Sequence, residues 1–331
     1  MRRAVANPLI EAQGIRKIFY KKSNSLFAPR EEVRAVNGVS LAIARGKTLG
    51  VVGESGCGKT TLGKILVNLI QPTEGRVLFE GTNTTLLTAR ARKALSSRIQ
   101  FIFQDPYSSL NPRMTMLESI AEGLGQQGSR REKMNTALAA AERCGLSTDL
   151  ADSYPHQFSG GQRQRICIAR AVVSKPDFIV CDEPVSSLDV SIRSQILNLL
   201  KELQDTMALS CLFITHDLRI AEFFCDEIAV MYRGVFLEKG KAESVFRNPQ
   251  HPYTESLSNA IPRLTWDEPG ENRAALPQTH FPEMPIRNGD EIGCPYAPRC
   301  PYAEKLCRET TPLLREFTPD RWIACHKPLR N

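Results

Sequence analysis

The 331-residue sequence contains no uninterrupted apolar stretch near the roughly 20 residues that a helix needs to cross a bilayer. Its first residues, Met1, Arg2 and Arg3, are not followed by the apolar region of a signal peptide. It has no internal repeat, and its 42% hydrophobic and 24% charged residues fit neither a disordered nor a fibrous protein. We therefore expect a cytoplasmic globular protein, either free or held at a membrane by partners.

The ten cysteines are distributed unevenly. In a chain without a secretion signal they argue against a disulfide framework, because the cytosol keeps thiols reduced. Six are scattered over the chain up to Cys225, and four crowd its C-terminal end: Cys294, Cys300, Cys307 and Cys325. This asymmetry predicts a separate C-terminal function. The formal net charge of +7 permits attraction to nucleic acid or anionic lipid but does not decide function.

Four short apolar runs, at 49–52, 101–103, 178–181 and 212–214, each end on polar residues. Unbroken runs are typical of strands that are buried on both faces, as in a mostly parallel sheet covered by helices. Helical spacing lies between the runs, at Leu62, Ile65, Leu66 and Leu69, and again at Ile192, Ile196, Leu199, Leu200 and Leu203. The pattern predicts an α/β fold. From about residue 248 the sequence becomes proline-rich and weakly periodic, which marks the start of an extension.

A phosphate-binding loop follows the first apolar run. The pattern G-x-x-x-x-G-K-[ST] is matched by Gly53, Glu54, Ser55, Gly56, Cys57, Gly58, Lys59 and Thr60, with Thr61 next. A strand-like run precedes it and a helix-like run follows it, which is the context that this motif requires. Its glycines let backbone N–H groups surround phosphate oxygens, Lys59 adds a charge, and Thr60 can bind magnesium. The motif predicts a nucleotide site.

Polar residues end the other three apolar runs. Asp182 is placed to hold magnesium, and Glu183 to orient and polarise an attacking water. His216 is placed to contact a γ-phosphate, and Gln104 to sense magnesium and water. Taken alone, each of these residues is typical of an ordinary polar strand end. Together they are expected at the carboxyl edge of the sheet, where open α/β sheets bind ligands.

A second anion-binding pattern opens a later helix. It contains Phe158, Ser159, Gly160, Gly161, Gln162 and Arg163. One nucleotide does not need two such sites in one subunit. Together these motifs closely resemble the ATP-binding cassette family, in which two cassettes bind two ATP molecules head to tail.

The resemblance implies roles that the residue patterns alone do not give. Ser159 and Gly161, with Gly160 and Gln162 beside them, would bind the ATP held at the partner's phosphate loop. The segment 186–189 resembles the family's loop that connects the two sites. An aromatic side chain near the N-terminus would stack on adenine. We choose Phe19 for this contact, and Tyr20 is nearly as good a candidate. The alternative for either residue is a position in the hydrophobic core.

The spacing between motifs favours a transporter. About 55 residues separate Gln104 from Ser159, which is enough for a short helical subdomain but not for the coiled coil of DNA-tethering relatives. Translation-type relatives usually carry two cassettes, and this chain has one set of motifs. The segment 105–117 is similar to the part of transporter cassettes that receives a coupling helix from the membrane subunit; the alternative is a surface loop.

The segment 248–254 and the cysteine-rich tail resemble the C-terminal extension of oligopeptide and dipeptide importer ATPases. An insertion between Lys21 and Val33, including Leu26-Phe27-Ala28-Pro29, is similar to the F-type subunit. The resemblance implies an ATP-binding cassette domain over 8–248 with a mixed β core and a helical subdomain over about 105–175. A small irregular extension over 249–331 follows.

The four tail cysteines follow the spacing C-x5-C-x6-C-x17-C, which lacks the C-x2-C pairs of zinc ribbons. Our first expectation is a [4Fe–4S] cluster on Cys294, Cys300, Cys307 and Cys325, as the resemblance suggests. Zinc and unliganded structural thiols are the alternatives. His326 is a candidate substitute ligand for Cys325, although a histidine beside a cysteine is more often incidental. Cys57 near a helix N-terminus is expected to have a lowered pKa, so that its oxidation would block ATP binding.

The sequence therefore predicts the ATPase subunit of a bacterial peptide importer that uses ATP and Mg²⁺. The family implies a second, D-type ATPase, two transmembrane permeases and a substrate-binding protein as partners. The subunit would lie peripherally on the cytoplasmic face of the inner membrane and bind no nucleic acid. The same machine with nickel, glutathione or murein peptide as cargo is the main alternative, and a nucleic-acid-linked ATPase is a weaker one.

Overall fold

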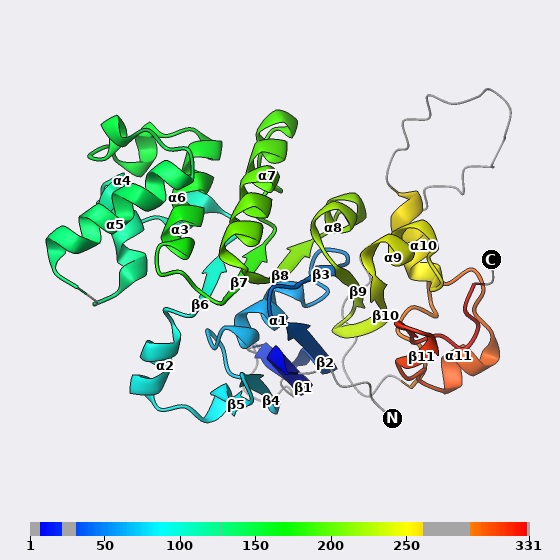
Figure 1. The fold of residues 1–331 in the computed structure, drawn as a ribbon. Coiled ribbons are helices and arrows are strands. Elements are labelled where there is room, and N and C mark those ends of the chain that lie inside the picture. The colour runs from blue at the N-terminus through cyan, green and yellow to red at the C-terminus, as the bar shows by residue number, and fades with distance from the viewer. Residues whose placement is uncertain (1–6, 22–30, 127, 261–291, 330–331) are drawn as a thin grey trace, which may run out of the picture.

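The computed structural model describes residues 7–21, 31–126, 128–260 and 292–329. Within these ranges the chain forms two β-sheets with helices packed around them (Figure 1). No helix in the described ranges is long and apolar enough to span a bilayer.

The larger sheet has eight strands in the order β11-β12-β10-β9-β3-β8-β7-β6. The five strands from β9 to β6 are parallel, and β10, β12 and β11 are antiparallel additions. The strands are β3 (Thr48–Val52), β6 (Ile99–Ile102), β7 (Phe178–Asp182), β8 (Ser210–Thr215), β9 (Glu227–Tyr232), β10 (Val235–Lys241), β11 (Arg315–Thr318) and β12 (Arg321–Ile323). The four apolar runs of the sequence all lie in or at the ends of its parallel strands.

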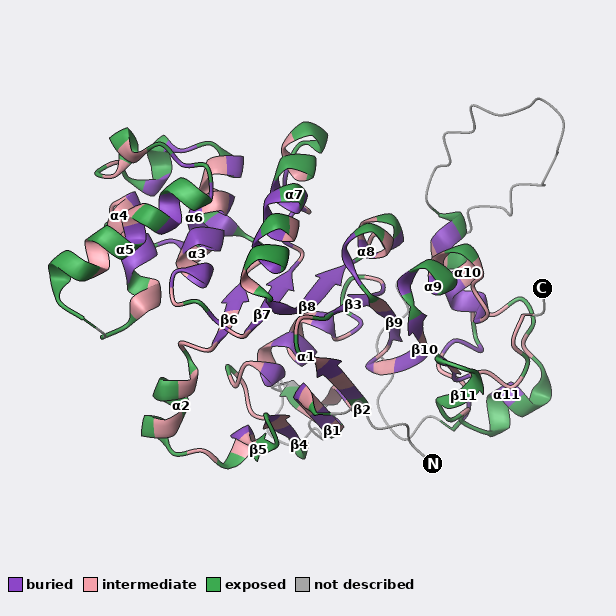
Figure 2. Cartoon of the chain, viewed as in Figure 1, coloured by how far each residue is buried: buried purple, intermediate pink, exposed green. Residues whose placement is uncertain are grey.

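The parallel strands are buried on both faces. Ile179 and Cys181 of β7 point into one hydrophobic core, while Phe178 and Val180 point into the other. Figure 2 shows this burial along the strands, with the exposed residues mostly on the outer faces of the helices. The α/β fold with a mixed sheet is thereby confirmed, because only strands covered on both sides can carry unbroken apolar runs.

The smaller sheet is antiparallel, in the order β2-β1-β4-β5, and contains β1 (Pro8–Lys21), β2 (Glu31–Ala44), β4 (Glu74–Phe79) and β5 (Thr82–Asn83). Helix α1 (Lys59–Leu66) shares one hydrophobic core with this sheet and the larger one. Its Leu62, Ile65 and Leu66 are fully buried. The helix ends at Leu66, and Leu69, which the periodicity placed on the same face, is 54% exposed.

Two groups of the remaining helices lie at opposite ends of the larger sheet. Helices α3, α4, α5 and α6 gather at its β6 end, and α9, α10 and α11 lie at its β10 end, with α7 and α8 between the two groups (Figure 1). Their bounds are α2 (Ala89–Leu95), α3 (Pro106–Ser109), α4 (Met116–Ala121), α5 (Arg130–Arg143), α6 (Gly160–Val172), α7 (Val190–Met207), α8 (Leu218–Phe224), α9 (Ala242–Arg247), α10 (Pro252–Asn259) and α11 (Lys305–Glu309). Single 3-10 turns lie at Thr84–Leu86, Glu122–Leu124, Thr148–Leu150 and Pro155–Gln157. The domain limits at residues 105, 175 and 248 stay predictions.

The C-terminal segment is joined to the larger sheet. Strand β12 pairs with β10, and Glu238 of β10, which is fully buried, accepts hydrogen bonds from Arg321 of β12 at 2.6 and 3.0 Å. The same carboxylate accepts the backbone N–H groups of Gln250 and His251. A buried carboxylate needs such partners, because its desolvation is otherwise costly. Glu238 therefore ties three segments of the chain together.

We predict that Arg321→Met destabilises the fold. The substitution leaves the Glu238 carboxylate buried without its cation, which costs about 3 kcal/mol or more of unfolding free energy. Chemical denaturation followed by circular dichroism measures this loss. Arg315→Met, on the exposed strand β11, is the matched control and should unfold like the wild type. Equal stability of the two variants would show that the Glu238 network does not hold the C-terminal segment.

Candidate functional site

The phosphate loop connects β3 to α1, and two of its glycines admit no other residue. A Cβ atom at Gly53 would lie 2.1 Å from the carbonyl oxygen of Met231. At Gly58, where φ is +109°, it would lie 2.0 Å from the carbonyl oxygen of Ala35. Glycine alone has neither the Cβ nor a penalty for positive φ. The loop is therefore packed closely against β9 and β2.

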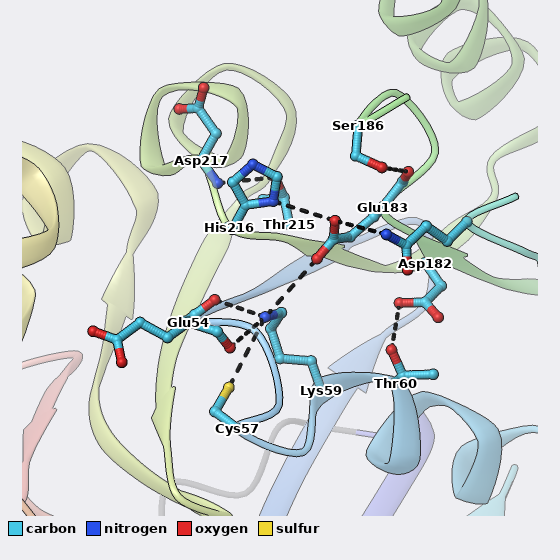
Figure 3. A network of polar contacts seen from close by, with 12 residues as sticks. Glu54, Cys57, Lys59, Thr60, Asp182, Glu183, Ser186, Thr215, His216 and Asp217 are labelled. Carbon is cyan, nitrogen blue, oxygen red and sulfur yellow. Dashed lines mark hydrogen bonds and ion pairs between the residues drawn. The ribbon is translucent and has the colours of Figure 1, made fainter. Parts of the chain in front are cut away.

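Lys59 lies inside this loop. Its Nζ atom donates to the carbonyl oxygens of Gly53 at 2.6 Å and Glu54 at 2.9 Å, and it lies 4.0 Å from Oε1 of Glu183 (Figure 3). The side chain is only 4% exposed. An ammonium so deeply buried needs these oxygen partners, so it holds the loop closed around itself.

An open hollow of about 360 Å³ lies over the loop. It is lined by Val33, Arg34, Ala35, Ser55, Gly56, Cys57, Gly58, Lys59, Thr60, Thr61, Gln104, Glu183, Arg233 and Gly234. The hollow thus joins the phosphate loop, the end of β6, the end of β7 and the β9–β10 turn.

Thr60 and Asp182 form the pair predicted for magnesium. The Thr60 hydroxyl donates to Oδ1 of Asp182 at 3.0 Å. Burial raises the pKa of Asp182, and the hydrogen bond from Thr60 opposes this effect. A buried carboxylate beside a hydroxyl is a set of hard oxygen ligands, and a divalent cation there would favour the ionised form.

Glu183 is the centre of the other predicted contacts. Its Oε2 atom lies 3.2 Å from Nδ1 of His216 (Figure 3). The same atom lies 3.4 Å from Nε2 of Gln104. Its backbone φ of +46° is unusual for a residue with a side chain. The bond to His216 is the main cause that lowers the pKa of Glu183, and the same bond raises the pKa of His216. The structure therefore brings Gln104, Glu183 and His216 together beside Lys59.

The second anion-binding pattern lies elsewhere. Ser159 caps α6: its hydroxyl accepts the N–H of Gln162 at 3.3 Å, and the Gln162 side chain accepts the N–H of Ser159 at 2.9 Å. Ser159 and Gly160 are exposed, whereas Gly161 packs so closely that a Cβ atom would lie 2.5 Å from Ile192. None of the four residues from Ser159 to Gln162 lines the hollow over the phosphate loop.

The aromatic candidates lie on β1. Phe19 is 42% exposed and Tyr20 is 56% exposed, so neither is a core residue. Phe19 pairs with Val33, which lines the hollow, but neither aromatic residue lines it. The insertion Leu26-Phe27-Ala28-Pro29 lies outside the described residues.

Sequence reasoning missed the β9–β10 turn. Gly234 donates its N–H to the carbonyl oxygen of Cys57 at 2.8 Å, and Arg233 lines the hollow. Gly234 has φ of +81°. The Arg233-Gly234 pair after an apolar run is a turn signal, but only the fold shows that the turn supports the phosphate loop.

The prediction of an iron–sulfur cluster is wrong. Among the residues that the structure describes, no group of three or more His, Cys, Asp or Glu side chains could hold a metal ion. The four tail cysteines border one cavity of only about 10 Å³, which is about the space of one water molecule. Burial raises the pKa of Cys294 and Cys300, and that of Cys325 to about 11, so these thiols are protonated near neutral pH.

The same search finds no zinc site among the described residues, and the third alternative, structural thiols, stays a prediction. His326, the substitute ligand, is bonded instead to the carbonyl oxygen of Thr310 at 2.8 Å. The expectation for Cys57 is also wrong: burial raises the pKa of this thiol, and neighbouring Lys59 only partly opposes that effect. A protonated, buried thiol is a poor target for oxidation.

We predict that Glu183→Gln lowers the pKa of His216, because the hydrogen bond to the Glu183 carboxylate is the largest cause that raises it. The carboxylate stabilises the imidazolium, and the amide cannot. NMR titration of labelled histidines measures the shift. His251 is the internal control, because burial lowers its pKa to about 3 and its signal should not titrate near neutral pH in either protein. An unchanged His216 titration would show that the 3.2 Å contact does not exist in solution.

The residues fit the nucleotide and the cation that the motifs imply. The loop glycines allow the close packing against β9 and β2, Lys59 and Arg233 border the hollow with positive charge, and Thr60 with Asp182 offers oxygen ligands. This fit rests on the chain's own geometry.

Comparison with known proteins agrees with the motifs. The sequence profile described as ABC transporter matches residues 36–186, and that of the oligopeptide/dipeptide transporter C-terminal region matches residues 237–307. The fold is similar to a solved dimeric structure of the ATP-binding cassette MJ0796 bound to ADP and Pi, with a TM-score of 0.62 and 28% identity. That likeness covers 70% of this chain and 98% of that one.

Two curated relatives match over nearly the full length. The chain is 45% identical over 320 residues to the dipeptide transport ATP-binding protein DppF of Haemophilus influenzae, which covers 96% of both chains. It is 40% identical over 324 residues to the oligopeptide transport ATP-binding protein AppF of Bacillus subtilis, which covers 96% of this chain and 97% of that one. The predicted resemblance is confirmed. The chain belongs to the ATPases of the ABC transporter family, in its dipeptide and oligopeptide transport branch.

Proposed function

We propose that this chain hydrolyses ATP to drive the import of dipeptides or oligopeptides. The observation that carries the proposal is the meeting of Gln104, Glu183 and His216 beside Lys59. A positioned base next to a phosphate loop is what hydrolysis of a terminal phosphate requires. The cargo class follows from the relatives, whose names specify dipeptide and oligopeptide transport.

The phosphate loop would bind the triphosphate. Its backbone N–H groups and the N-terminus of α1 attract phosphate oxygens. Lys59, which now donates to loop carbonyls, would donate to phosphate oxygens instead. Phe19 near the C-terminal end of β1, or Tyr20 beside it, would stack on adenine.

Glu183 would take the proton from the attacking water. Its lowered pKa keeps the carboxylate ionised, and His216 and Gln104 hold its Oε2 atom in place. His216 would in addition contact the γ-phosphate. Bound Mg²⁺ would supply charge neutralisation on the phosphate oxygens, and Thr60, Asp182 and Gln104 are the residues that would hold it.

A second cassette ATPase would complete each site. In one chain, the pattern from Ser159 to Gln162 does not border the hollow over the phosphate loop. Ser159 and Gly160 are exposed at the N-terminus of α6, where the helix dipole suits a phosphate that a partner holds. The similar MJ0796 cassette was solved as a dimer. We propose a D-type ATPase as the partner, since this chain is similar to F-type subunits.

The membrane subunits would dock beside α2. A groove of about 610 Å³ lies there, bordered by α2, the end of β6 and residues 122–126. Leu69 lines it and is 54% exposed. The sequence predicts that the segment 105–117 forms part of this groove. Ser109 of that segment borders the groove, whereas Met116 is fully buried in the core. This groove would take a coupling helix of one permease, and the partner ATPase would take the other, which would place the subunit peripherally on the cytoplasmic face of the inner membrane.

We predict that Glu183→Gln cuts ATP turnover about 100-fold or more while ATP binding is retained, because the base is lost but the phosphate contacts remain. A phosphate-release assay measures turnover, and calorimetry measures binding. Glu202→Gln, which makes the same change at an exposed position of α7, is the matched control and should leave both unchanged. Turnover within a few-fold of the wild type would assign the base to another residue.

Co-purification tests the transport assignment. The chain is isolated from gently solubilised native membranes, and the proteins that accompany it are identified by mass spectrometry. We expect two multi-span permeases and a second cassette ATPase, and the substrate-binding protein encoded beside them would separate peptides from nickel, glutathione or murein peptide. Ribosomal or DNA-repair proteins without a permease would favour a nucleic-acid-linked ATPase instead, with activity that falls steeply with salt.

A further inference from the structure

Two residues of the C-terminal region, meaning the described residues from 249 onward, contact the phosphate loop. The guanidinium of Arg299 donates to both carboxylate oxygens of Glu54, from Nη1 to Oε2 at 2.8 Å and from Nη2 to Oε1 at 3.0 Å. This two-pronged geometry is the strongest that an arginine and a carboxylate can form. The two residues are 245 positions apart in the sequence.

A second contact fixes the backbone of the same residue. The N–H of Glu54 donates to the hydroxyl of Tyr253 at 3.0 Å, and Tyr253 is only 1% exposed. Its ring packs against those of Tyr232 and Tyr296, with centroids 4.7 and 5.2 Å apart. The Arg299 guanidinium lies 5.9 Å from both of these ring centroids. The two contacts therefore come from a well-packed aromatic cluster.

Glu54 links this cluster to Lys59. Its carbonyl oxygen accepts from Lys59 Nζ at 2.9 Å, while its carboxylate points away from Lys59 (Figure 3). A bare carboxylate in a phosphate-binding loop would repel the phosphate oxygens. Arg299 neutralises that charge and fixes its direction.

We propose that Arg299 is a positioning residue that holds Glu54 and thereby sets the affinity of the phosphate loop for ATP. This inference rests on the proposed function, since ATP is the ligand. It gives the C-terminal region a task at the nucleotide site that requires no metal.

The test compares Arg299→Met with the wild type in the full-length protein. Binding is measured by calorimetry with ATP in EDTA, where no hydrolysis occurs, and KM and kcat are measured with Mg²⁺. We expect the Kd and KM for ATP to rise about tenfold, equivalent to about 1.4 kcal/mol. We expect kcat to change less than about twofold, because Arg299 holds Glu54, whereas the orientation of Glu183 depends on its contact with His216. Arg299→Lys keeps the positive charge but cannot form two parallel hydrogen bonds to the carboxylate, so it should give an intermediate Kd.

A second substitution separates charge neutralisation from packing. In a Glu54→Gln background no carboxylate is left to neutralise, so Arg299→Met should weaken ATP binding less than about threefold there. Lys327→Met removes another cation of the same region, which pairs with Glu304, and is the control expected to bind like the wild type. Thermal unfolding of each variant shows that the C-terminal region stays folded.

Two results would overturn the inference. One is an unchanged ATP affinity in Arg299→Met with a normal unfolding temperature. The other is an equal loss in the wild-type and Glu54→Gln backgrounds, which would mean that Arg299 acts through packing alone. In either case, a wild-type protein that binds and hydrolyses ATP would leave the proposed function intact. A wild-type protein that binds no ATP would contradict both the proposed function and this inference.

Discussion

The buried ammonium of Lys59 is the feature on which the geometry of the site depends. A cation that is 4% exposed must be surrounded by oxygens, and here the carbonyls of Gly53 and Glu54 provide them, with Glu183 at 4.0 Å. The loop can wrap around the ammonium only where glycines permit close approach to β9 and β2. The buried ammonium thus accounts for the inward-facing carbonyls of the loop and for the approach of the Glu183 carboxylate.

The part of the site that lies on the parallel strands could be predicted from sequence. Unbroken apolar runs fix which segments are central strands, and parallel strands end at one edge of the sheet. Gln104, Glu183 and His216 each follow such a run, so their meeting needs only local patterns and the sheet order. Residues of this kind are predictable because each position is set by the strand that precedes it.

Contacts between distant segments could not be predicted in this way. Nothing near Arg299 or Glu54 in the sequence points to the other, because their pairing depends on how the C-terminal region packs on β9. The tail cysteines show the same limit: spacing gives the number of thiols but not the size of the space between them or their burial. Leu69 follows the helical period but lies beyond the end of α1, where packing rather than periodicity decides.

The C-terminal region is attached to the cassette by two arginine–carboxylate pairs that differ in surroundings. Glu238 and Arg321 are 0% and 7% exposed, whereas Glu54 and Arg299 are 39% and 22% exposed. A pair without access to water contributes mainly through the penalty of breaking it, so the first serves folding. The second pair is partly hydrated and lies in the loop that surrounds Lys59, so changes there alter the nucleotide site at little cost to the fold. The same kind of ion pair therefore stabilises the fold in one place and acts on the nucleotide site in the other. The access of water to the pair determines which of these two roles it has.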